Sequence, residues 1–320
     1  MPKPLISIIM PVKNAEPFLL ECLGSILKQT FPDWELIVVE DHSTDNSLEM
    51  LQEYAHSESK INLYQNRQSG IISALQMGLE KCSGSYITRM DADDRMPADR
   101  LQKMYMAIAG KKKKSIVTGL VKYFSDHPVS PGYQKYEKWL NRINIEGKQW
   151  ENIYRECVIA SPNWMVRKED LVNIGGFNNL SYPEDYHMVL KWYQHGFSVF
   201  VVPGTTLYWR EHPQRTSRNS ENYGQEAFFD LKINTFIKHD LKSDNLVIWG
   251  DNEKTKLTAQ ILERRKIPFI HLKKSSFDEI ERIHQLQLLV GVYPSRMERT
   301  KIEKYLQQLD FIEGIHWWYL

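Results

Sequence analysis

The sequence is poor in cysteine, and its three cysteines, Cys22, Cys82 and Cys157, form no C-x-x-C pair. A sparse, odd set of this kind excludes a disulfide-stapled fold and indicates reduced thiols in a cytoplasmic protein. The chain also has almost no net charge, because 41 basic residues face 40 acidic ones and leave +1. This balance excludes a polycation built to bind nucleic acid.

Long hydrophobic runs are missing as well. The apolar stretch Leu5–Val12 is far shorter than the roughly 18 residues needed to cross a bilayer. It contains Pro11, is followed by Lys13 and has no small-residue cleavage site, so we interpret it as a strand and not as a signal peptide. Apolar residues still make up 42% of the 320-residue chain, which is enough for a large core.

The first two hundred residues alternate apolar runs with amphipathic stretches, which predicts an α/β fold with βαβ units on a largely parallel sheet. The amphipathic stretches follow the i, i+3, i+4, i+7 spacing of a helix with one apolar face. The predicted strands are 5–10, 34–39, 61–64, 85–90, 116–124, 158–166 and 197–202, the last stopped by Pro203-Gly204. The predicted helices cover 18–26, 48–54, 71–79, 184–195 and 222–239, whereas residues 125–156 are irregular and are interpreted as an insertion or a wall over the site.

A domain boundary is predicted near Lys242-Ser243, which divides the chain into domains 1–242 and 243–320. The second domain reads as a small Rossmann-like α/β unit, with strands at 246–249, 269–272 and 288–292 and helices at 253–265 and 297–309. Its first strand leads into Gly250, but the loop has one glycine and carries Asp251 and Glu253. These acids would repel a pyrophosphate, so the loop favours packing or partner docking over nucleotide binding.

Four polar side chains follow predicted strands of the first domain: Asn14, Asp41, Asp91 and Asp93. In open α/β sheets the loops at the carboxyl ends of the strands converge on one crevice, where ligands bind. Residues i and i+2 of an extended segment point the same way, so Asp91 and Asp93 are expected to face that crevice together. Paired carboxylates there suit Mg²⁺ or Mn²⁺ on a diphosphate, or they form a solvated turn before the next helix.

A second acidic pair, Glu184-Asp185, opens the predicted helix 184–195. Acidic residues stabilise the N-terminal end of a helix through its dipole, so the pair has a purely structural explanation. Its functional alternative is a general base on a rigid element that takes the proton of an incoming hydroxyl. The spacing alone leaves both interpretations open.

Taken together, these segments resemble glycosyltransferase family 2, the inverting nucleotide-sugar enzymes of the GT-A fold, over about residues 5–218. Several ordered motifs carry the resemblance. They are residues 10–15 (MPVKNA), 38–45 (VVEDHSTD), 70–78 (GIISALQMG), 89–94 (RMDADD), Gly175-Gly176-Phe177, Glu184-Asp185, and 208–212 (YWREH) with Ser217. His42 and Gln76 depart from the family pattern, which usually has glycine and asparagine there.

The resemblance implies a role for each matched position. It implies a hexosyltransferase that uses a nucleotide sugar, with UDP as the expected nucleotide, Mn²⁺ or Mg²⁺ as the cation and a saccharide or lipid-linked acceptor, in bacterial polysaccharide or glycolipid assembly. The implied roles are uracil and ribose binding by Pro11, Asn14 and Asp41, ribose or sugar contact by Asp91, cation binding by Asp93 with His212, base catalysis by Asp185 beside Glu184, and phosphate or sugar contacts by Arg67 and Arg210.

Two other functions remain open from the sequence. One is a nucleotidyltransferase, which usually opens with a glycine-rich basic loop where this chain has Val12-Lys13-Asn14-Ala15-Glu16. The other is a non-catalytic protein that binds nucleotide sugars, against which the presence of Asp91, Asp93 and Asp185 argues.

Two features bear on membranes. The run Lys111–Lys114 is a solvated turn or a contact with anionic lipid at the inner face of the membrane. The terminal segment Trp317–Leu320 is either an interfacial anchor or a cover for the edge of the small domain. The sequence identifies neither the sugar nor the oligomeric state.

Overall fold

The computed structural model of the protein describes residues 5–273, 277–292 and 296–320. The chain forms two compact units, one of residues 1–147 with 159–219 and the other of residues 148–158 with 220–320. The segment 225–239 belongs to the second unit in this division, and the domain boundary at 242–243 stays a prediction from the sequence. Among the described residues, no helix has both the length and the apolar character required to cross a bilayer.

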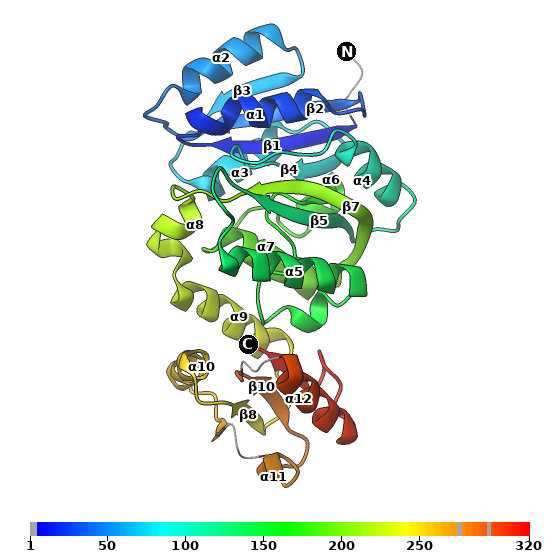
Figure 1. The fold of residues 1–320 in the computed structure, drawn as a ribbon, viewed down its shortest axis with the longest axis vertical. Coiled ribbons are helices and arrows are strands. Elements are labelled where there is room, and N and C mark those ends of the chain that lie inside the picture. The colour runs from blue at the N-terminus through cyan, green and yellow to red at the C-terminus, as the bar shows by residue number, and fades with distance from the viewer. Residues whose placement is uncertain (1–4, 274–276, 293–295) are drawn as a thin grey trace. The chain divides into compact units, whose positions relative to one another are not determined.

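The first unit is built on a seven-stranded sheet in the order β3-β2-β1-β4-β6-β5-β7 (Figure 1). All neighbouring strands run parallel except β6, which is antiparallel to both β4 and β5. The strands are β1 (Ile6–Val12), β2 (Trp34–Glu40), β3 (Ile61–Gln65), β4 (Tyr86–Arg89), β5 (Ser115–Phe124), β6 (Trp164–Arg167) and β7 (Ser198–Arg210). The predicted α/β class, with a mostly parallel sheet, is confirmed.

Helices flank this sheet, and their apolar faces form its core. Helix α3 packs on β1 and β2, whereas α4 packs on β5, β6 and β7. The central strand β1 is almost entirely buried, which explains its largely apolar sequence, with Ser7 as its one polar residue. The helices are α1 (Glu16–Leu27), α2 (Ser47–Ser57), α3 (Ile71–Lys81), α4 (Arg100–Ile108), α5 (Pro131–Glu146), α6 (Lys168–Asn173), α7 (Glu184–Gln194) and α8 (Thr216–Asn219).

Three predictions for this unit were wrong. Residues 131–146, expected to be irregular, form helix α5, whose buried face is limited to Leu140, Ile143 and Asn144. The strand predicted at 158–166 begins only at Trp164, because Asn163 N–H bonds back to the carbonyl of Ala160 and closes a turn.

The third concerns β7, which does not stop at Pro203-Gly204. These two residues are skipped in the pairing with β5, where Val202 faces Gly119 and Thr205 faces Leu120. Proline cannot donate to a ladder, and a bulge accommodates it without ending the strand. The strand therefore continues to Arg210.

The second unit contains a parallel four-stranded sheet in the order β11-β10-β8-β9. Its strands are β8 (Leu246–Trp249), β9 (Ile270–Leu272), β10 (Gln287–Val290) and β11 (Trp317–Tyr319). Its helical elements are η1 (Trp150–Asn152), η2 (Glu221–Tyr223), α9 (Gln225–His239), α10 (Glu253–Arg264), α11 (Phe277–Ile280) and α12 (Arg296–Gln308). A small Rossmann-like unit was expected here, and the separate parallel sheet confirms it.

The C-terminal aromatic segment belongs to this second sheet. Trp317, Trp318 and Tyr319 form β11, pair with β10 and are 3%, 1% and 5% exposed. Buried side chains are not available to a membrane interface, so the alternative of an interfacial anchor is wrong and the segment covers the sheet edge. The four residues Lys111–Lys114 are exposed, and Lys113 pairs with Glu169 at 2.6 Å.

Candidate active site

Asp41 is held rigidly at the carboxyl end of β2. Its N–H donates to the carbonyl of Val12 at 2.8 Å, which ties it to the end of the neighbouring strand β1. Its carboxylate accepts from Asn66 Nδ2 at 2.7 Å and from Gly70 N at 3.0 Å, and it is 4% exposed. The carboxylate is therefore oriented before any ligand arrives.

The loop after β1 is tied to the loop after β2. Asn14 N donates to Ser43 Oγ at 3.0 Å, and Asn14 Oδ1 accepts from Thr44 N at 2.8 Å. Pro11 lies in β1 opposite Val39, whereas Arg67 is exposed in the loop after β3. The structure thus brings the predicted Pro11, Asn14 and Asp41 to adjacent strand ends.

The two departures from the expected pattern have structural explanations. His42 adopts φ +56°, a conformation that glycine reaches without strain, which accounts for a glycine being usual there. Gln76 Nε2 donates to the carbonyl of Phe177 at 3.2 Å and so fixes the turn at Gly175-Gly176-Phe177.

Arg89, the last residue of β4, organises the carboxylates of the site. Its guanidinium is almost fully buried, with Nε 2.7 Å from Asp91 Oδ1 and Nη1 3.2 Å from Glu184 Oε1. It therefore joins the two acidic segments that the sequence placed 93 positions apart, from Asp91 to Glu184. Sequence analysis missed Arg89, although a charged residue closing an apolar strand was a signal for it.

Asp91 has a second partner, since Ser161 Oγ donates to Asp91 Oδ2 at 3.3 Å. Burial raises the pKa of Asp91, and the neighbouring Asp93 adds to the effect, while Arg89 opposes it. The two acids of the predicted pair therefore interact electrostatically, as a shared crevice requires.

Asp93 faces the residue expected to help it hold a cation. His212 Nε2 lies 2.8 Å from Asp93 Oδ2, and the His212 ring contacts Phe18 at 4.4 Å between centroids. Burial acts to raise the pKa of Asp93, but the His212 hydrogen bond and the Arg215 charge outweigh it and hold that pKa below its usual value.

Arg210 holds the loop that carries Asp93 and Asp94. Its Nε donates to the carbonyl of Asp93 at 2.8 Å, its N–H donates to Asp94 Oδ1 at 2.7 Å, and its guanidinium pairs with Glu21. It is 5% exposed. The phosphate or sugar contact by Arg210 stays a prediction. In the structure Arg210 positions Asp93 through its hydrogen bond to the Asp93 carbonyl.

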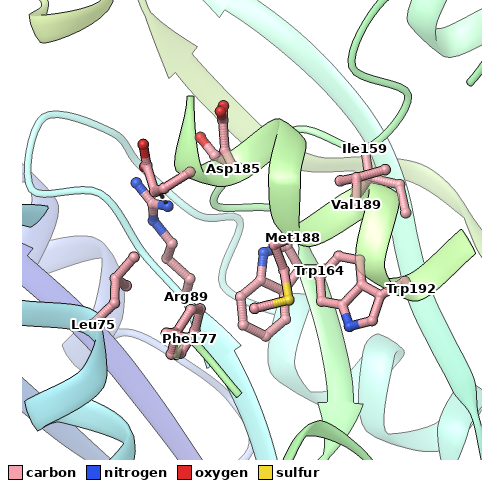
Figure 2. Close-up of a pocket in the computed structure, with 11 residues that line it drawn as sticks. Leu75, Arg89, Ile159, Trp164, Phe177, Asp185, Met188, Val189 and Trp192 are labelled. Atoms are coloured by element: carbon pink, nitrogen blue, oxygen red, sulfur yellow. Dashed lines mark hydrogen bonds and ion pairs between the residues drawn. The ribbon is translucent and has the colours of Figure 1, made fainter. Parts of the chain in front are cut away.

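Asp185 is the second residue of helix α7 and lines a pocket with Arg89 and Glu184 (Figure 2). Its Oδ1 accepts from the adjacent Tyr186 N at 2.7 Å, and the carboxylate lies in the first turn of the helix, where the helix dipole favours negative charge. Burial, and then repulsion from Glu184, raise the pKa of Asp185 to about 7, although Arg89 acts in the opposite direction. A carboxylate with this pKa suits proton abstraction near neutral pH.

Tyr182, three residues before Asp185, lies close to the residues that hold Asp41. A Cβ on Gly70 would lie 3.2 Å from the Tyr182 hydroxyl, and Gly70 N is the donor to Asp41. Gly70 also has φ +109°, which favours glycine there. Tyr182 thus lies beside the glycine that holds Asp41, whereas Asp185 interacts electrostatically with Arg89 and Asp91.

The set Asp93 and His212 fits a divalent cation. It offers one carboxylate oxygen and one imidazole nitrogen, and Mn²⁺ or Mg²⁺ on a nucleotide commonly takes few protein ligands besides phosphate oxygens and water. Across the described ranges, no preformed group of three or more histidine, cysteine or acidic side chains is arranged to hold a metal ion.

Comparison with known proteins decides the family. The profile of the family described as "Glycosyl transferase family 2" matches residues 7–175, more than half of the chain. This chain belongs to that family. The matched range contains Pro11, Asn14, Asp41, Asp91 and Asp93, whereas Asp185 and His212 lie beyond it.

Two curated family members illustrate the likeness. Glycosyltransferase GlyG of Streptococcus pneumoniae is 32% identical over 183 residues, which cover 55% of this chain and 60% of GlyG. The putative teichuronic acid biosynthesis glycosyltransferase TuaG of Bacillus subtilis is 37% identical over 102 residues, 32% of this chain and 40% of TuaG. The chain thus spans less than two thirds of these relatives.

Solved structures share the fold. TarS of S. aureus, in complex with UDP-GlcNAc, has a TM-score of 0.57 at 20% identity over 82% of this chain and 72% of that chain. The mannosyltransferase PcManGT of Pyrobaculum calidifontis, with GDP-Man and Mn²⁺, has a TM-score of 0.54 at 21% identity, covering 81% and 70%. At these identities the likeness concerns the fold.

Proposed function

We propose that this chain is a metal-dependent, inverting glycosyltransferase that moves a hexose from a nucleotide sugar, with UDP as the nucleotide, to a hydroxyl acceptor. The observation that carries the proposal is Asp185, an acid with a pKa of about 7 that lines a pocket and whose neighbour Glu184 is joined through Arg89 to Asp91. Family membership supports the reaction class.

In the proposed reaction, Asp185 takes the proton of the acceptor hydroxyl while that oxygen attacks the anomeric carbon. Attack from the face opposite the nucleoside diphosphate is a single substitution, so the configuration inverts. Asp41, Asn14 and Pro11 hold the base and ribose, Asp91 contacts the ribose or the sugar, and Arg67 and Arg210 are proposed near phosphate or sugar. Arg89 balances the charges of Glu184 and Asp91, so Asp185 can ionise near neutral pH.

A Mn²⁺ or Mg²⁺ ion bound to Asp93 and His212 would neutralise the charge that develops on the departing diphosphate. The distance of 2.8 Å between His212 Nε2 and Asp93 Oδ2 supports the proposal that both side chains bind one cation. Arg210 fixes the backbone of Asp93 and thereby keeps the carboxylate in place.

The products test the proposal against its alternatives. The purified chain, incubated with Mn²⁺, a panel of nucleotide sugars and saccharide acceptors, is expected to release a nucleoside diphosphate and to form a glycoside of inverted configuration. Pyrophosphate release would instead identify a nucleotidyltransferase. Donor binding without hydrolysis or transfer would leave a non-catalytic binding protein.

Asp93→Asn is expected to reduce transfer at least about a hundredfold, because electrostatic stabilisation of a leaving group is worth several kcal/mol. The stabilisation of the protein by Mn²⁺ with UDP, measured as a shift in melting temperature, should shrink in parallel. Asp99→Asn is the matched control, since the Asp99 side chain is 48% exposed and pairs with Lys103 one helical turn away at 2.7 Å. Equal transfer by both variants would refute the assignment of Asp93.

The wider role is proposed from the relatives. The name of TuaG, a putative teichuronic acid biosynthesis glycosyltransferase, supports a role in bacterial polysaccharide assembly. A saccharide or lipid-linked acceptor at the cytoplasmic face of the membrane is part of the proposal. The exposed Lys111–Lys114 run supports peripheral contact with anionic lipid. Anionic liposomes are expected to sediment the protein at low salt and to release it at high salt, whereas neutral liposomes should not bind it.

A further inference from the structure

The loop after β7 carries an arginine, Arg215, to which the sequence assigned no role. The strand ends at Arg210, and the N–H of Arg215 donates to the carbonyl of His212 at 3.4 Å, which closes a turn between them. Because β7 runs parallel to β5, this loop leaves the carboxyl end of its strand. It therefore lies at the edge of the sheet where Asp93 follows β4.

Aromatic rings hold the guanidinium of Arg215. Its Cζ lies 5.1 Å from the centroid of the Trp209 ring and 5.5 Å from that of Tyr133. The Trp209 ring is itself stacked on Tyr123, with centroids 4.9 Å apart. The faces of aromatic rings attract a guanidinium and restrict its orientation. The cation is therefore positioned by the fold.

Arg215 differs from the arginines around it in its partners. Arg210 pairs with Glu21, and Arg218 of helix α8 pairs with Glu211. Arg215 forms no ion pair with a carboxylate of the described chain, and its buried Nη1 has no hydrogen-bond acceptor there. An arginine side chain keeps its proton, so a buried N–H of this kind requires an acceptor.

The charges nearest to Arg215 belong to the proposed cation site. Burial acts to lower the pKa of Arg215, but Tyr123, Asp94 and Asp93 outweigh it and raise that pKa, so the group stays charged. An anion bound to a cation on Asp93 would therefore come close to Arg215. The structural alternative is that Arg215 only balances Asp94, whose Oδ2 is also buried without a partner among the described residues.

A diphosphate has the properties that this position requires. Its oxygens accept hydrogen bonds, its negative charge offsets that of the guanidinium, and the planar fork of arginine matches the spacing of phosphate oxygens. A sugar hydroxyl would accept from Nη1 but would leave the charge unbalanced. The position thus favours the phosphate part of a nucleotide sugar over its sugar.

We propose that Arg215 binds the diphosphate of the donor and stabilises it as it leaves, an inference that rests on the proposed function for its connection to catalysis. When the bond between the anomeric carbon and the diphosphate oxygen breaks, its electron pair stays on that oxygen. Arg215 donates hydrogen bonds to the diphosphate and transfers no proton, because Asp185 takes the proton of the acceptor.

The inference is tested by nucleotide binding. Affinities for UDP, UMP and uridine are measured calorimetrically with Mn²⁺, and the guanine series is used if the unaltered chain binds GDP more tightly. Arg215→Gln is expected to weaken binding of the diphosphate at least about tenfold and to leave binding of the nucleoside unchanged. Arg215→Lys keeps the charge without the fork and should fall between. A parallel loss for UMP would place the contact at the α-phosphate, and a loss for UDP alone at the β-phosphate.

Arg218→Gln is the matched control from the same loop. Arg218 also lies over Tyr133, with its Cζ 4.9 Å from the ring centroid, but it is 36% exposed and already paired with Glu211. Its affinity for UDP should stay within about twofold of the unaltered chain. In sugar transfer, Arg215→Gln should lower kcat about 100-fold, the usual effect of removing one donor to a developing negative charge. Melting temperatures without ligand establish that each variant is folded.

The outcomes separate this inference from the proposed function. Four results would overturn the inference: no binding of either nucleoside diphosphate by the unaltered chain, unchanged affinity in Arg215→Gln, an equal loss for UDP and uridine, or an equal loss in Arg218→Gln. Unchanged affinity in the folded variant would mean that Arg215 only balances Asp94. Binding of UDP that depends on Arg215, without sugar transfer by the unaltered chain, would instead count against the proposed function alone.

Discussion

Asp185→Asn is expected to lower kcat for sugar transfer by about 100- to 10,000-fold, the usual contribution of a positioned general base. Asparagine keeps the size of the side chain but takes up no proton from the acceptor hydroxyl. The unaltered chain should gain activity as the pH rises through about 7, where Asp185 loses its proton, and should then reach a plateau. Initial rates at saturating donor and Mn²⁺ between pH 5 and 9 measure both effects.

The same substitution is expected to stabilise the fold. The pKa of about 7 in the folded protein lies above the ordinary value of 3.8, so the folded state holds this proton more tightly than the unfolded chain does. The stabilisation from protonation is complete below about pH 4 and is lost as the pH rises through 7. Asp185→Asn should therefore raise the melting temperature more at pH 8 than at pH 4.

Two observations would reject the base assignment. One is turnover by Asp185→Asn within a few fold of the unaltered chain, and the other is an activity profile without a rise near neutral pH. Glu184→Gln is the comparison, because Glu184 is 2% exposed and bonded to Arg89. Glu184→Gln is expected to lower the stability of the fold, and it is expected to lower the pKa of Asp185 because Glu184 repels the charged form of that acid.

Arg89→Met is expected to destabilise the first unit by about 3–5 kcal/mol, because it leaves the carboxylates of Glu184 and Asp91 buried without their cation. Urea unfolding monitored by far-UV circular dichroism measures the change. Since Arg89 lowers the pKa of Asp185, its removal should also move the rise in activity to higher pH.

Arg264→Met provides the matched control. Arg264 also contacts two carboxylates, Glu226 at 3.7 Å and Asp230 at 2.9 Å, but its side chain is 55% exposed. An exposed arrangement of this kind contributes at most about 1 kcal/mol. If Arg89→Met costs no more than Arg264→Met, or leaves the pH profile in place, then Arg89 is not the organiser of these acids.

The strands were predictable where burial dictates composition. β1, β2 and β8 have largely apolar sequences because both faces of the sheet are covered, and their predicted limits agree with the structure within about two residues. The acids at strand ends were predictable for a related reason, because parallel strands deliver their following loops to one edge.

Other features depend on contacts between distant segments, which a local pattern does not contain. Nothing near β6 indicates that it runs antiparallel between β4 and β5. Helix α5 was missed because tyrosine, lysine and asparagine dilute its short apolar face. The pairing of Arg89 with Glu184 and the pocket lined by Asp185 form only once α7 lies beside the end of β4.

The bulge in β7 takes up extra chain before the strand reaches the cation ligands. From Val202 to Leu207 this strand advances five positions while its partner advances two, from Gly119 to Val121, so β7 carries three more residues than β5. These residues loop out of the ladder and add no length along the sheet. After them, the pairing of 207–210 with 121–124 fixes where the strand ends, two residues before His212. Changes in the length of segment 203–206 can therefore be absorbed without moving His212 away from Asp93.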